Sequence, residues 1–275
     1  MLLTDGENQH ETPEQLTKAI ETVRGRFQAD CRGLGAAWVV DEVRRISDAL
    51  MGTVGLIPRR EDMAAEFEAL MRTAMGRGVA EASLKVWAPQ GAEVLFVRQV
   101  SPTLEDLTPR RRAEGPLTGV YPTGAWGDES RDYHVCVRLP AKAVGAEQLA
   151  ARVQLAVGGE VVTQGLVKAR WSGDDSLTAR INPEVAHYTG QTEMATAIQQ
   201  GLAAKAVGDD RTATTKLGRA VQLATEAGDA GATDRLSRVV DIDDAATGTV
   251  RLKRGVDKLD EMALDTASTK TTRVR

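Results

Sequence analysis

The feature that most constrains the fold is the N-terminal stretch, where the apolar pair Leu2-Leu3 runs directly into Thr4-Asp5-Gly6. An apolar run that ends in Thr-Asp-Gly predicts the end of a buried strand followed by a turn. A helix is expected next, because Thr12 suits an N-cap and Pro13 suits the first helical turn. Apolar residues then recur at helical spacing, at Leu16, Ala19, Ile20 and Val23. A strand followed by a helix predicts a βαβ unit, in which Asp5 lies at the carboxyl end of its strand, where open α/β sheets bind ligands.

The same succession of strand and helix signals continues over about the first 76 residues. A strand pattern at residues 27–35, a helix at about 39–50, a strand pattern at 52–57 and a last helix follow one another. In this order, and with its glycines, the segment resembles the C-terminal half of a von Willebrand factor A (vWA) domain. The resemblance implies a truncated, Rossmann-like half-sheet over residues 1–77.

The vWA resemblance also implies a metal site of which this chain carries one ligand. In that family a metal-ion-dependent adhesion site (MIDAS) holds Mg²⁺ with an Asp-x-Ser-x-Ser loop, a threonine and the aspartate of a Thr-Asp-Gly loop. Only that last aspartate, Asp5, is matched here. Because Mg²⁺ needs near-octahedral oxygen coordination, we expect Asp5 to bind it weakly even beside Glu7, so that Mg²⁺ is expected only in a complete domain. The alternative is an aspartate that caps its own turn.

The missing half of the vWA pattern leads to two expectations. The chain is expected to be a fragment, or the product of a late start, of a longer protein. The strand before Asp5 is expected to present a long apolar edge, and unpaired edges template pairing with other chains. We therefore expect self-association through residues 1–35.

Composition bounds the classes of partner and compartment. A net charge of −4 gives no reason to expect nucleic-acid binding, and the run Arg110-Arg111-Arg112 lacks an aromatic platform, so we interpret it as a solvated loop. The sequence holds no apolar run of about 18 residues and no basic-then-apolar leader, so neither a membrane span nor a secretion signal is expected. Cys31 and Cys136 are expected to be buried, reduced thiols, which indicates a cytoplasmic protein.

Residues 78–185 change to the two-residue period of strands. Several short strands at this spacing predict an antiparallel β-sandwich. Gly158-Gly159 predicts a hairpin turn, whereas the polar segment 101–124 is expected to be a long loop. The strand patterns lie at residues 82–86, 93–97, 132–139, 151–157 and 166–171.

Ser130, Asp132 and His134 lie close together in sequence and suggest a catalytic triad. We favour a polar outer face or an Asp–His cross-strand pairing, because no Gly-x-Ser-x-Gly elbow exposes the serine and alternate strand residues lie about 6.5 Å apart. The remaining aromatic and histidine candidates have no site pattern. Trp126 and Trp171 are expected as core or edge aromatics, and His10 and His187 as isolated loop residues.

Residues 186–264 are predicted to form a small helical bundle. Apolar residues keep a 3.6-residue period in runs that are broken at Gly208-Asp209-Asp210 and Gly228-Asp229. One more amphipathic helix is expected over 250–262. The small residues of the bundle resemble tetratricopeptide helix pairs, but a single repeat is fewer than the about three that a solenoid needs.

Residues 265–275 have no apolar period and are rich in hydroxyl groups, so they predict a disordered tail. Thr271, with Val274 three residues later, resembles the phosphothreonine-x-x-aliphatic ligand of forkhead-associated domains. Thr269 and Thr272 are competing phosphoacceptors. A phosphate would add nearly two negative charges and create a ligand for an arginine-lined pocket. The alternative is a solvated terminus without a role.

Together these patterns predict an α/β segment, a β-sandwich and a helical bundle in one non-enzymatic chain. The architecture resembles actinobacterial vWA proteins that act in serine/threonine kinase signalling, which implies protein partners such as kinases and forkhead-associated domains. An alternative is an accessory subunit of a metal-chelatase or ATPase-type assembly. A structural scaffold without metal is a further alternative.

Overall fold

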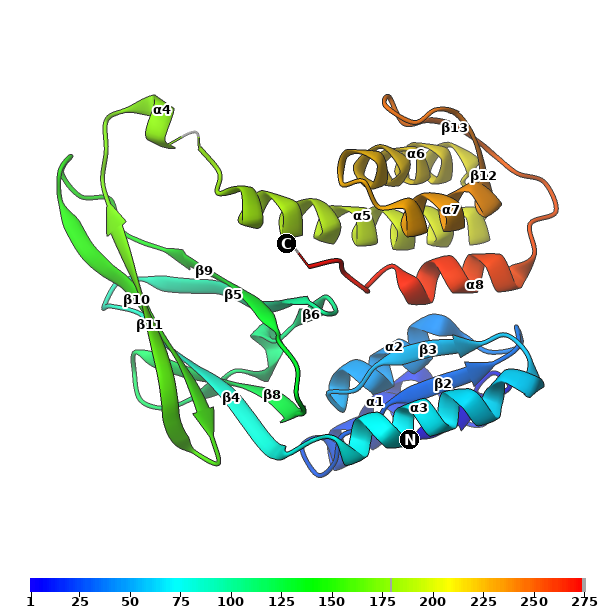
Figure 1. The fold of residues 1–275 in the computed structure, drawn as a ribbon, viewed down its shortest axis with the longest axis horizontal. Helices are drawn as coiled ribbons and strands as arrows, with labels where there is room; N and C mark the ends of the chain where they lie inside the picture. The colour runs from blue at the N-terminus through cyan, green and yellow to red at the C-terminus, as the bar shows by residue number, and fades with distance from the viewer. Residues whose placement is uncertain (179, 274–275) are drawn as a thin grey trace. The chain divides into compact units, whose positions relative to one another are not determined.

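The computed structural model describes residues 1–178 and 180–273. Its fold is mixed α/β, and the chain divides into two compact units (Figure 1). The first unit joins residues 1–70 to residues 187–274, and the second comprises mainly residues 71–186. The predicted segments 1–77 and 186–264 therefore contribute to one unit, although about a hundred residues separate them.

The N-terminal part of the first unit is a small parallel sheet with helices. The strands pair in the order β1-β2-β3, with Leu2 opposite Cys31 and Cys31 opposite Val54. This arrangement confirms the predicted order of strands and helices. The elements are β1 (Leu2–Thr4), α1 (Pro13–Val23), β2 (Cys31–Leu34), α2 (Val40–Ala49), β3 (Val54–Ile57), η1 (Arg60–Asp62) and α3 (Met63–Met75).

The start of α1 is fixed locally, as the sequence predicts. The Thr12 hydroxyl accepts a hydrogen bond from the Gln15 N–H, and the Gln15 side chain accepts one of 2.8 Å from the Thr12 N–H. This capping box satisfies two backbone donors that the helix itself leaves unpaired. The loop that carries Asp5 consequently ends at Thr12.

The β1 strand is an edge strand, but the predicted long apolar edge is wrong in extent. The strand has three residues, of which Leu2 packs against the buried cluster that contains Cys31 and Trp38. Leu3 alone is an exposed large apolar side chain of β1, at 38%. Leu2 is half-buried because it packs against the core that α2 shares with the sheet, whereas Leu3 stays exposed.

The C-terminal part of the first unit is helical with one added hairpin. Asp209 and Asp229 cap α6 and α7 through their side chains, at the two breaks that the sequence predicts. The predicted helix over 250–262 is wrong, because Val250 and Leu252 alternate along a strand and the helix begins only at Lys258. The elements are α5 (Pro183–Ala206), α6 (Asp210–Glu226), α7 (Ala230–Val239), β12 (Val240–Asp244), β13 (Thr249–Leu252) and α8 (Lys258–Ala267).

A close approach of two glycines places this hairpin on α6. A Cβ atom on Gly218 would lie 2.2 Å from the carbonyl oxygen of Gly248, which no side chain can tolerate. Gly248 also has a positive φ of 70° in the turn between β12 and β13. Val250 can then join the core of α6 and α7 from the neighbouring strand.

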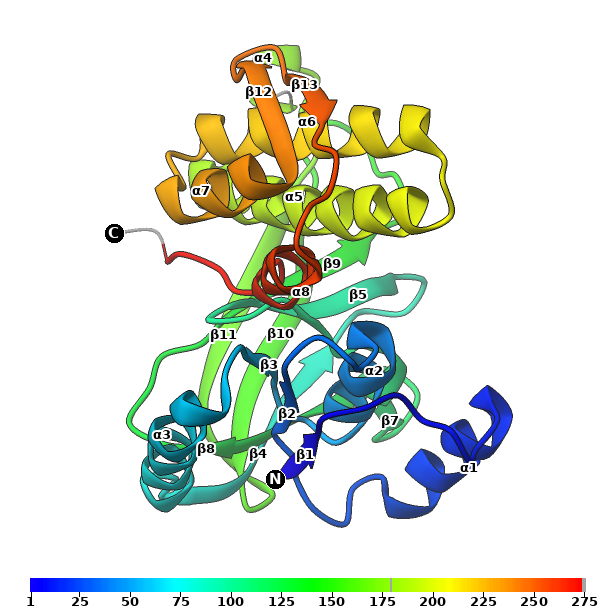
Figure 2. The ribbon, with the colours of Figure 1, turned by 90° about the vertical axis from the view of Figure 1, so that its right-hand side faces the viewer.

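Helix α8 contributes to both cores of the first unit. Leu264 packs in the cluster of α5, α6 and α7, whereas Met262 packs with Trp38 and Val43 of the α/β part. Arg44 of α2 donates to the Asp265 carboxylate at 2.6 Å and to the Asp265 carbonyl at 3.0 Å. Figure 2 shows α8 lying alongside α7 in this unit. The N-terminal and C-terminal parts of the first unit are therefore joined by α8, which packs in the core of each.

The second unit is a sandwich of two antiparallel sheets, as the sequence predicts. The sheets have the strand orders β11-β10-β4-β8-β7 and β6-β5-β9. Leu84, Val97 and Tyr121 come from both sheets and pack in one buried cluster. The elements are β4 (Val79–Trp87), β5 (Glu93–Ser101), β6 (Glu105–Asp106), η2 (Thr108–Arg110), β7 (Arg112–Ala113), β8 (Thr118–Trp126), β9 (Asp132–Arg138), β10 (Glu147–Val157), β11 (Glu160–Arg170) and α4 (Asp175–Thr178).

The expectation of a long loop over 101–124 is wrong. Most of β8 lies in this segment and pairs with β4. Gly119, Tyr121 and Thr123 are buried on alternate positions, but glycine and proline obscure this period in the sequence. Arg110 is not solvated either, because it pairs with Glu105 and its side chain is only 10% exposed.

Candidate functional site

Asp5 lies where the sequence predicts, directly after β1 at the carboxyl edge of the parallel sheet, and it is exposed. The turn that carries it is closed by Thr4, whose hydroxyl donates to the Gly6 carbonyl at 2.8 Å and accepts from the Gly6 N–H at 3.3 Å. Thr4, rather than Asp5, therefore makes the local hydrogen bonds of the turn. The Asp5 carboxylate is presented to solvent on a defined loop.

The neighbouring loops at this edge are held together by backbone and ring contacts. The Gly35 N–H donates to the Ile57 carbonyl at 2.9 Å, so the ends of β2 and β3 are tied. The Trp38 indole donates to the Gly35 carbonyl at 2.9 Å and lies over Gly33, where a Cβ would come within 1.9 Å of the ring. A rigid, apolar support thus lies under the edge that carries Asp5.

The residues present do not make a complete set of ligands for Mg²⁺. Within residues 1–178 and 180–273, no group of three or more His, Cys, Asp or Glu side chains could hold a metal ion. Asp5 supplies one carboxylate, and the Thr4 hydroxyl is already bonded to Gly6. Mg²⁺ takes six ligands in near-ideal octahedral geometry, so we derive no chemistry through a metal at this edge.

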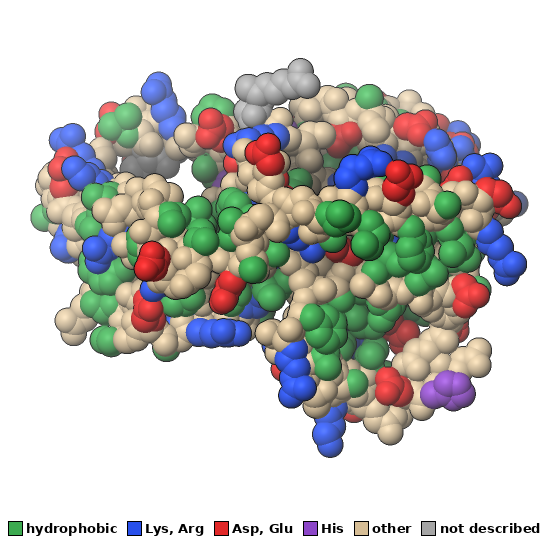
Figure 3. Space-filling model, turned by 60° about the horizontal axis from the view of Figure 1, so that its bottom comes forward, with side chains coloured by type: hydrophobic (Ala, Val, Ile, Leu, Met, Phe, Trp, Pro, Cys, Tyr) green, Lys and Arg blue, Asp and Glu red, His purple; other side chains and the backbone are tan. Residues whose placement is uncertain are grey.

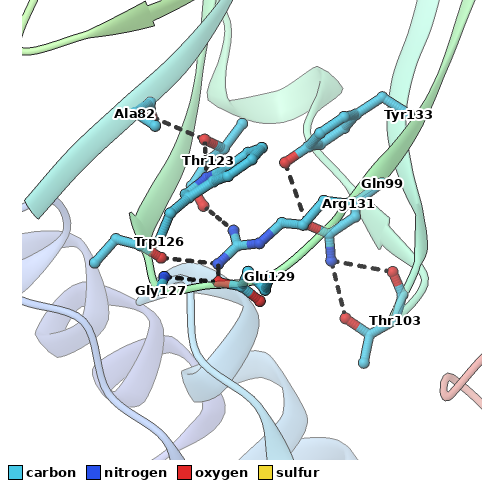
Figure 4. A network of polar contacts seen from close by, with 10 residues as sticks. Ala82, Gln99, Thr103, Thr123, Trp126, Gly127, Glu129, Arg131 and Tyr133 are labelled. Atoms are coloured by element: carbon cyan, nitrogen blue, oxygen red, sulfur yellow. Dashed lines mark hydrogen bonds and ion pairs between the residues drawn. The ribbon is translucent and has the colours of Figure 1, made fainter. Parts of the chain in front are cut away.

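A second polar cluster lies in the sandwich and is centred on Arg131 (Figure 4). Arg131 donates to the carbonyls of Thr123 and Ala125 at 2.7 and 2.8 Å and to the Glu129 carboxylate at 2.7 Å. Its guanidinium carbon lies 4.8 Å from the centre of the Trp126 ring. The Trp126 indole in turn donates to the Thr123 hydroxyl at 3.0 Å. The loop between β8 and β9 is therefore held by one cation whose side chain is only 10% exposed.

The electrostatics of this cluster indicate a structural brace. Burial opposes ionisation of Glu129, but hydrogen bonds from Arg131 and from the Gly127 N–H outweigh it and lower the pKa of this carboxyl. Burial raises the pKa of Tyr133 to about 12, so its hydroxyl stays protonated and donates to Gln99 at 3.4 Å. A network whose groups satisfy one another rigidifies a core. The sequence shows no signal for Arg131, because its partners are mostly backbone carbonyls.

The suggested triad residues lie at the start of β9. Ser130 is exposed in the preceding loop, whereas Asp132 and His134 lie on the strand opposite Ser101 and Arg98. Burial lowers the pKa of His134, and the charge of Asp132 opposes that change. Asp132 and His134 lie on the same strand, so the expected pairing of an aspartate and a histidine across neighbouring strands is wrong for these two residues.

The C-terminal segment is ordered on α5, where the sequence predicts a disordered tail. Gln191, at 3% exposure, donates to the Thr272 carbonyl and hydroxyl and accepts from the Thr272 N–H. His187 lies on α5, not in a loop, and its Nε2 is 3.0 Å from the same carbonyl. Thr269 and Thr271 are half-buried, and Val274 lies outside the described residues. The segment is ordered by contacts with α5, which is distant in sequence, so the local sequence pattern does not reveal this order.

The remaining candidates stay apart from these clusters. His10 is exposed in the loop before α1, as expected, and Trp171 is half-buried beyond the end of β11 with Lys142 5.8 Å from its ring centre. Cys31 is buried and Cys136 half-buried, and both are free thiols. Of the described helices, none is long and apolar enough to span a membrane.

Comparison with known proteins found a family model that matches part of the chain. Residues 222–268 match the family model described as von Willebrand factor type A C-terminal domain. This segment runs from the end of α6 to the end of α8, so it includes Met262, Leu264 and Asp265, which join the two parts of the first unit. The comparison with curated proteins found no match.

The chain is similar over nearly its whole length to a solved vWA protein. The von Willebrand factor type A protein from Catenulispora acidiphila is 49% identical, with a TM-score of 0.94, over 99% of this chain and 65% of that chain. This chain thus spans about two thirds of that relative. Two further solved structures are too weakly similar to support an inference. The ArnB paralog VWA2 from Sulfolobus acidocaldarius has a TM-score of 0.47 and 14% identity, over 98% of this chain and 62% of that chain. The human COPII-coat protein Sec24c has a TM-score of 0.43 and 12% identity, over 96% of this chain and 35% of that chain.

Proposed function

We propose that this chain is a non-enzymatic protein-interaction module of the vWA type. The observation that carries the proposal is the exposed Asp5, held on a defined loop at the carboxyl edge of a parallel sheet, in a chain similar over 99% of its length to a vWA protein. Ligands bind open α/β sheets at this edge. The mutual bonding of the Arg131 cluster supports a structural role for this polar part of the sandwich.

The compartment and the signalling role belong to the same proposal. Two free thiols support a reducing compartment such as the cytoplasm. Thr271, Thr269 and Thr272 are the proposed phosphoacceptors of serine/threonine kinases, and a forkhead-associated domain is the proposed reader of the phosphorylated segment. Val274 is the proposed aliphatic contact.

The interaction is tested by comparing three versions of the chain as bait in extracts of the source cell, with and without Mg²⁺. We expect the wild type and Glu7→Gln, which removes a neighbouring exposed carboxylate, to recover the same partner. Asp5→Asn should reduce recovery at least about tenfold, because contacts at the centre of an interface dominate its energy. Equal recovery with Asp5→Asn would refute the proposed edge. Recovery of a chelatase or ATPase subunit would favour the alternative of an accessory subunit.

The metal expectation is tested separately by isothermal titration with Mg²⁺. One carboxylate should give a dissociation constant of roughly millimolar or weaker. Tight binding that is lost in Asp5→Asn but kept in Glu7→Gln would contradict this expectation.

The signalling role is tested with peptides of residues 265–275. A peptide phosphorylated at Thr271 should bind a forkhead-associated domain from the same cell with micromolar affinity, roughly −8 kcal/mol, because a short ligand loses entropy on ordering. The unphosphorylated peptide and a phosphorylated Val274→Ala peptide are the controls. Binding that is unchanged by the phosphate or by Val274→Ala would remove the signalling role.

A further inference from the structure

The segment after α8 is held on α5 by the side chain of Gln191, which hydrogen-bonds to the backbone of Thr272 as another peptide group would. Gln191 accepts a hydrogen bond of 3.2 Å from the Thr272 N–H and donates one of 3.0 Å to the Thr272 carbonyl. A carboxamide carries the same donor and acceptor as a peptide group, so this pair resembles one rung of a β-ladder. A third contact of 2.8 Å joins the Gln191 Nε2 to the Thr272 hydroxyl.

His187 lies beside this contact, one turn earlier on the same helix. Its Nε2 lies 3.0 Å from the Thr272 carbonyl oxygen and 2.7 Å from the Gln191 Nε2. Residues four apart share a face of a helix, so both side chains reach the same peptide group. Because Gln191 is only 3% exposed, leaving its amide unbonded would be unfavourable.

A second anchor lies further along α5. The Gln199 amide donates to the Ser268 hydroxyl at 3.1 Å, and Ser268 is 5% exposed. Gln191 and Gln199 are eight residues apart, which is about 12 Å along a helix. Ser268 and Thr269 form a turn at the end of α8, in which the Lys270 N–H donates to the Ala267 carbonyl at 3.0 Å. The contacts of Ser268 with Gln199 and of Thr272 with Gln191 place the segment after α8 along α5, and the red trace beyond α8 can be followed in Figure 2.

We propose that Gln191 is a latch that holds the C-terminal segment on α5 and controls access to Thr271 and Thr272. This inference deepens the proposed signalling role and rests on it. A kinase transfers the terminal phosphoryl group of a nucleoside triphosphate to a threonine hydroxyl oxygen. The hydroxyl proton passes to a carboxylate of the kinase, and the nucleoside diphosphate departs. The Thr272 hydroxyl oxygen accepts from Gln191 and its backbone is paired, so the segment must leave α5 before a kinase can bind it.

Trypsin is a direct probe of the latch, because Lys270 and Arg273 flank the held residues. Cleavage after Lys270 should require the open segment, so its rate reports the open population. In the full chain, Gln191→Ala should raise this rate at least about tenfold. Gln200→Ala, an exposed glutamine on the same helix, should leave it within about twofold of the wild type. Equal rates for the wild type and Gln191→Ala would overturn the latch.

Hydrogen exchange and phosphorylation complete the test. The Thr272 amide should exchange slowly in the wild type and at least about tenfold faster in Gln191→Ala, with Gln200→Ala unchanged. A serine/threonine kinase that phosphorylates the 265–275 peptide should modify Gln191→Ala faster than the wild type, and unchanged rates would contradict the control of access. Failure of the phosphopeptide to bind a forkhead-associated domain removes the signalling role alone, since exchange and proteolysis measure the latch without it.

Discussion

A core helix of the first unit and an edge strand of the second unit differ in how far their apolar side chains are covered. In the first unit, Met262 from the C-terminal segment is 5% exposed against Trp38 from the N-terminal segment. In the second unit, the edge strand β11 leaves Val162 and Leu166 exposed at 59% and 56%. Figure 3 shows hydrophobic side chains at the surface on the side of the view that β10 and β11 occupy in Figure 1. An apolar residue therefore contributes to stability in this protein only where a second segment covers it.

The largest expected effect tests the core that the distant segments share. Met262→Ala should lower the free energy of unfolding by about 2–4 kcal/mol, because it removes a buried side chain and leaves a cavity against Trp38 and Val43. Met75→Ala, at a methionine that is 82% exposed, should change it by less than about 0.5 kcal/mol. Urea unfolding followed by circular dichroism measures both. Equal effects would show that α8 does not stabilise the α/β part.

The next effect tests whether a buried cation braces the sandwich. Arg131→Met keeps the apolar stem but leaves the carbonyls of Thr123 and Ala125 and the Glu129 carboxylate without their donor. We expect a loss of roughly 2–3 kcal/mol in the unfolding free energy. Arg138→Met removes an exposed ion pair to Glu93 and should cost less than about 0.5 kcal/mol. If urea unfolding shows similar losses for both variants, the Arg131 cluster is not a brace.

A pH effect is expected from a buried thiol of the first unit. Burial raises the pKa of the Cys31 thiol to about 11 from an ordinary value of 9.0. Since the folded pKa is the higher one, this contribution to stability is complete below about pH 9 and is lost as the pH rises through 11, roughly 3 kcal/mol in all for two pKa units. Unfolding free energies between pH 8 and 11 should fall more steeply for the wild type than for Cys31→Ala. Parallel slopes would contradict the shift.

The smallest effect is expected on the exposed strand. Val162→Thr on β11 should change the unfolding free energy by less than about 0.5 kcal/mol, because water already reaches the side chain. Val97→Thr, at a fully buried position of the same unit, should cost roughly 1–3 kcal/mol, since its hydroxyl loses hydration. Thermal unfolding of the two variants compares them directly. A large loss for Val162→Thr would mean that β11 is covered.

Local chemistry accounts for the parts of the fold that were predicted well. The capping box at Thr12 and the hairpin at Gly158-Gly159 depend on residues close together in sequence. Both glycines of the hairpin have a positive φ. The position of Asp5 after β1 follows in the same way from its Thr-Asp-Gly turn. The position of Asp5 could therefore be predicted from the sequence. Whether a metal or a partner binds there depends on further ligands and contacts, which the residues next to Asp5 do not supply.

Burial by distant segments explains the errors. The strand β8 has no clear period in sequence, and it forms because β4 pairs with it and Tyr121 enters the core. The segment after α8 looks disordered, and Gln191, about eighty residues earlier, holds it. Arg131 could not be recognised, since its partners are carbonyls that every residue possesses.

The sequence by itself determined where strands turn and where most helices begin, because those events depend on capping side chains and glycines within a few residues. The tertiary structure decided which apolar residues are buried, that Met262 and Trp38 share a core, and that Thr272 is held by Gln191. Burial and the pairing of buried polar groups are properties of neighbours in space, and a chain brings those neighbours together only when it folds.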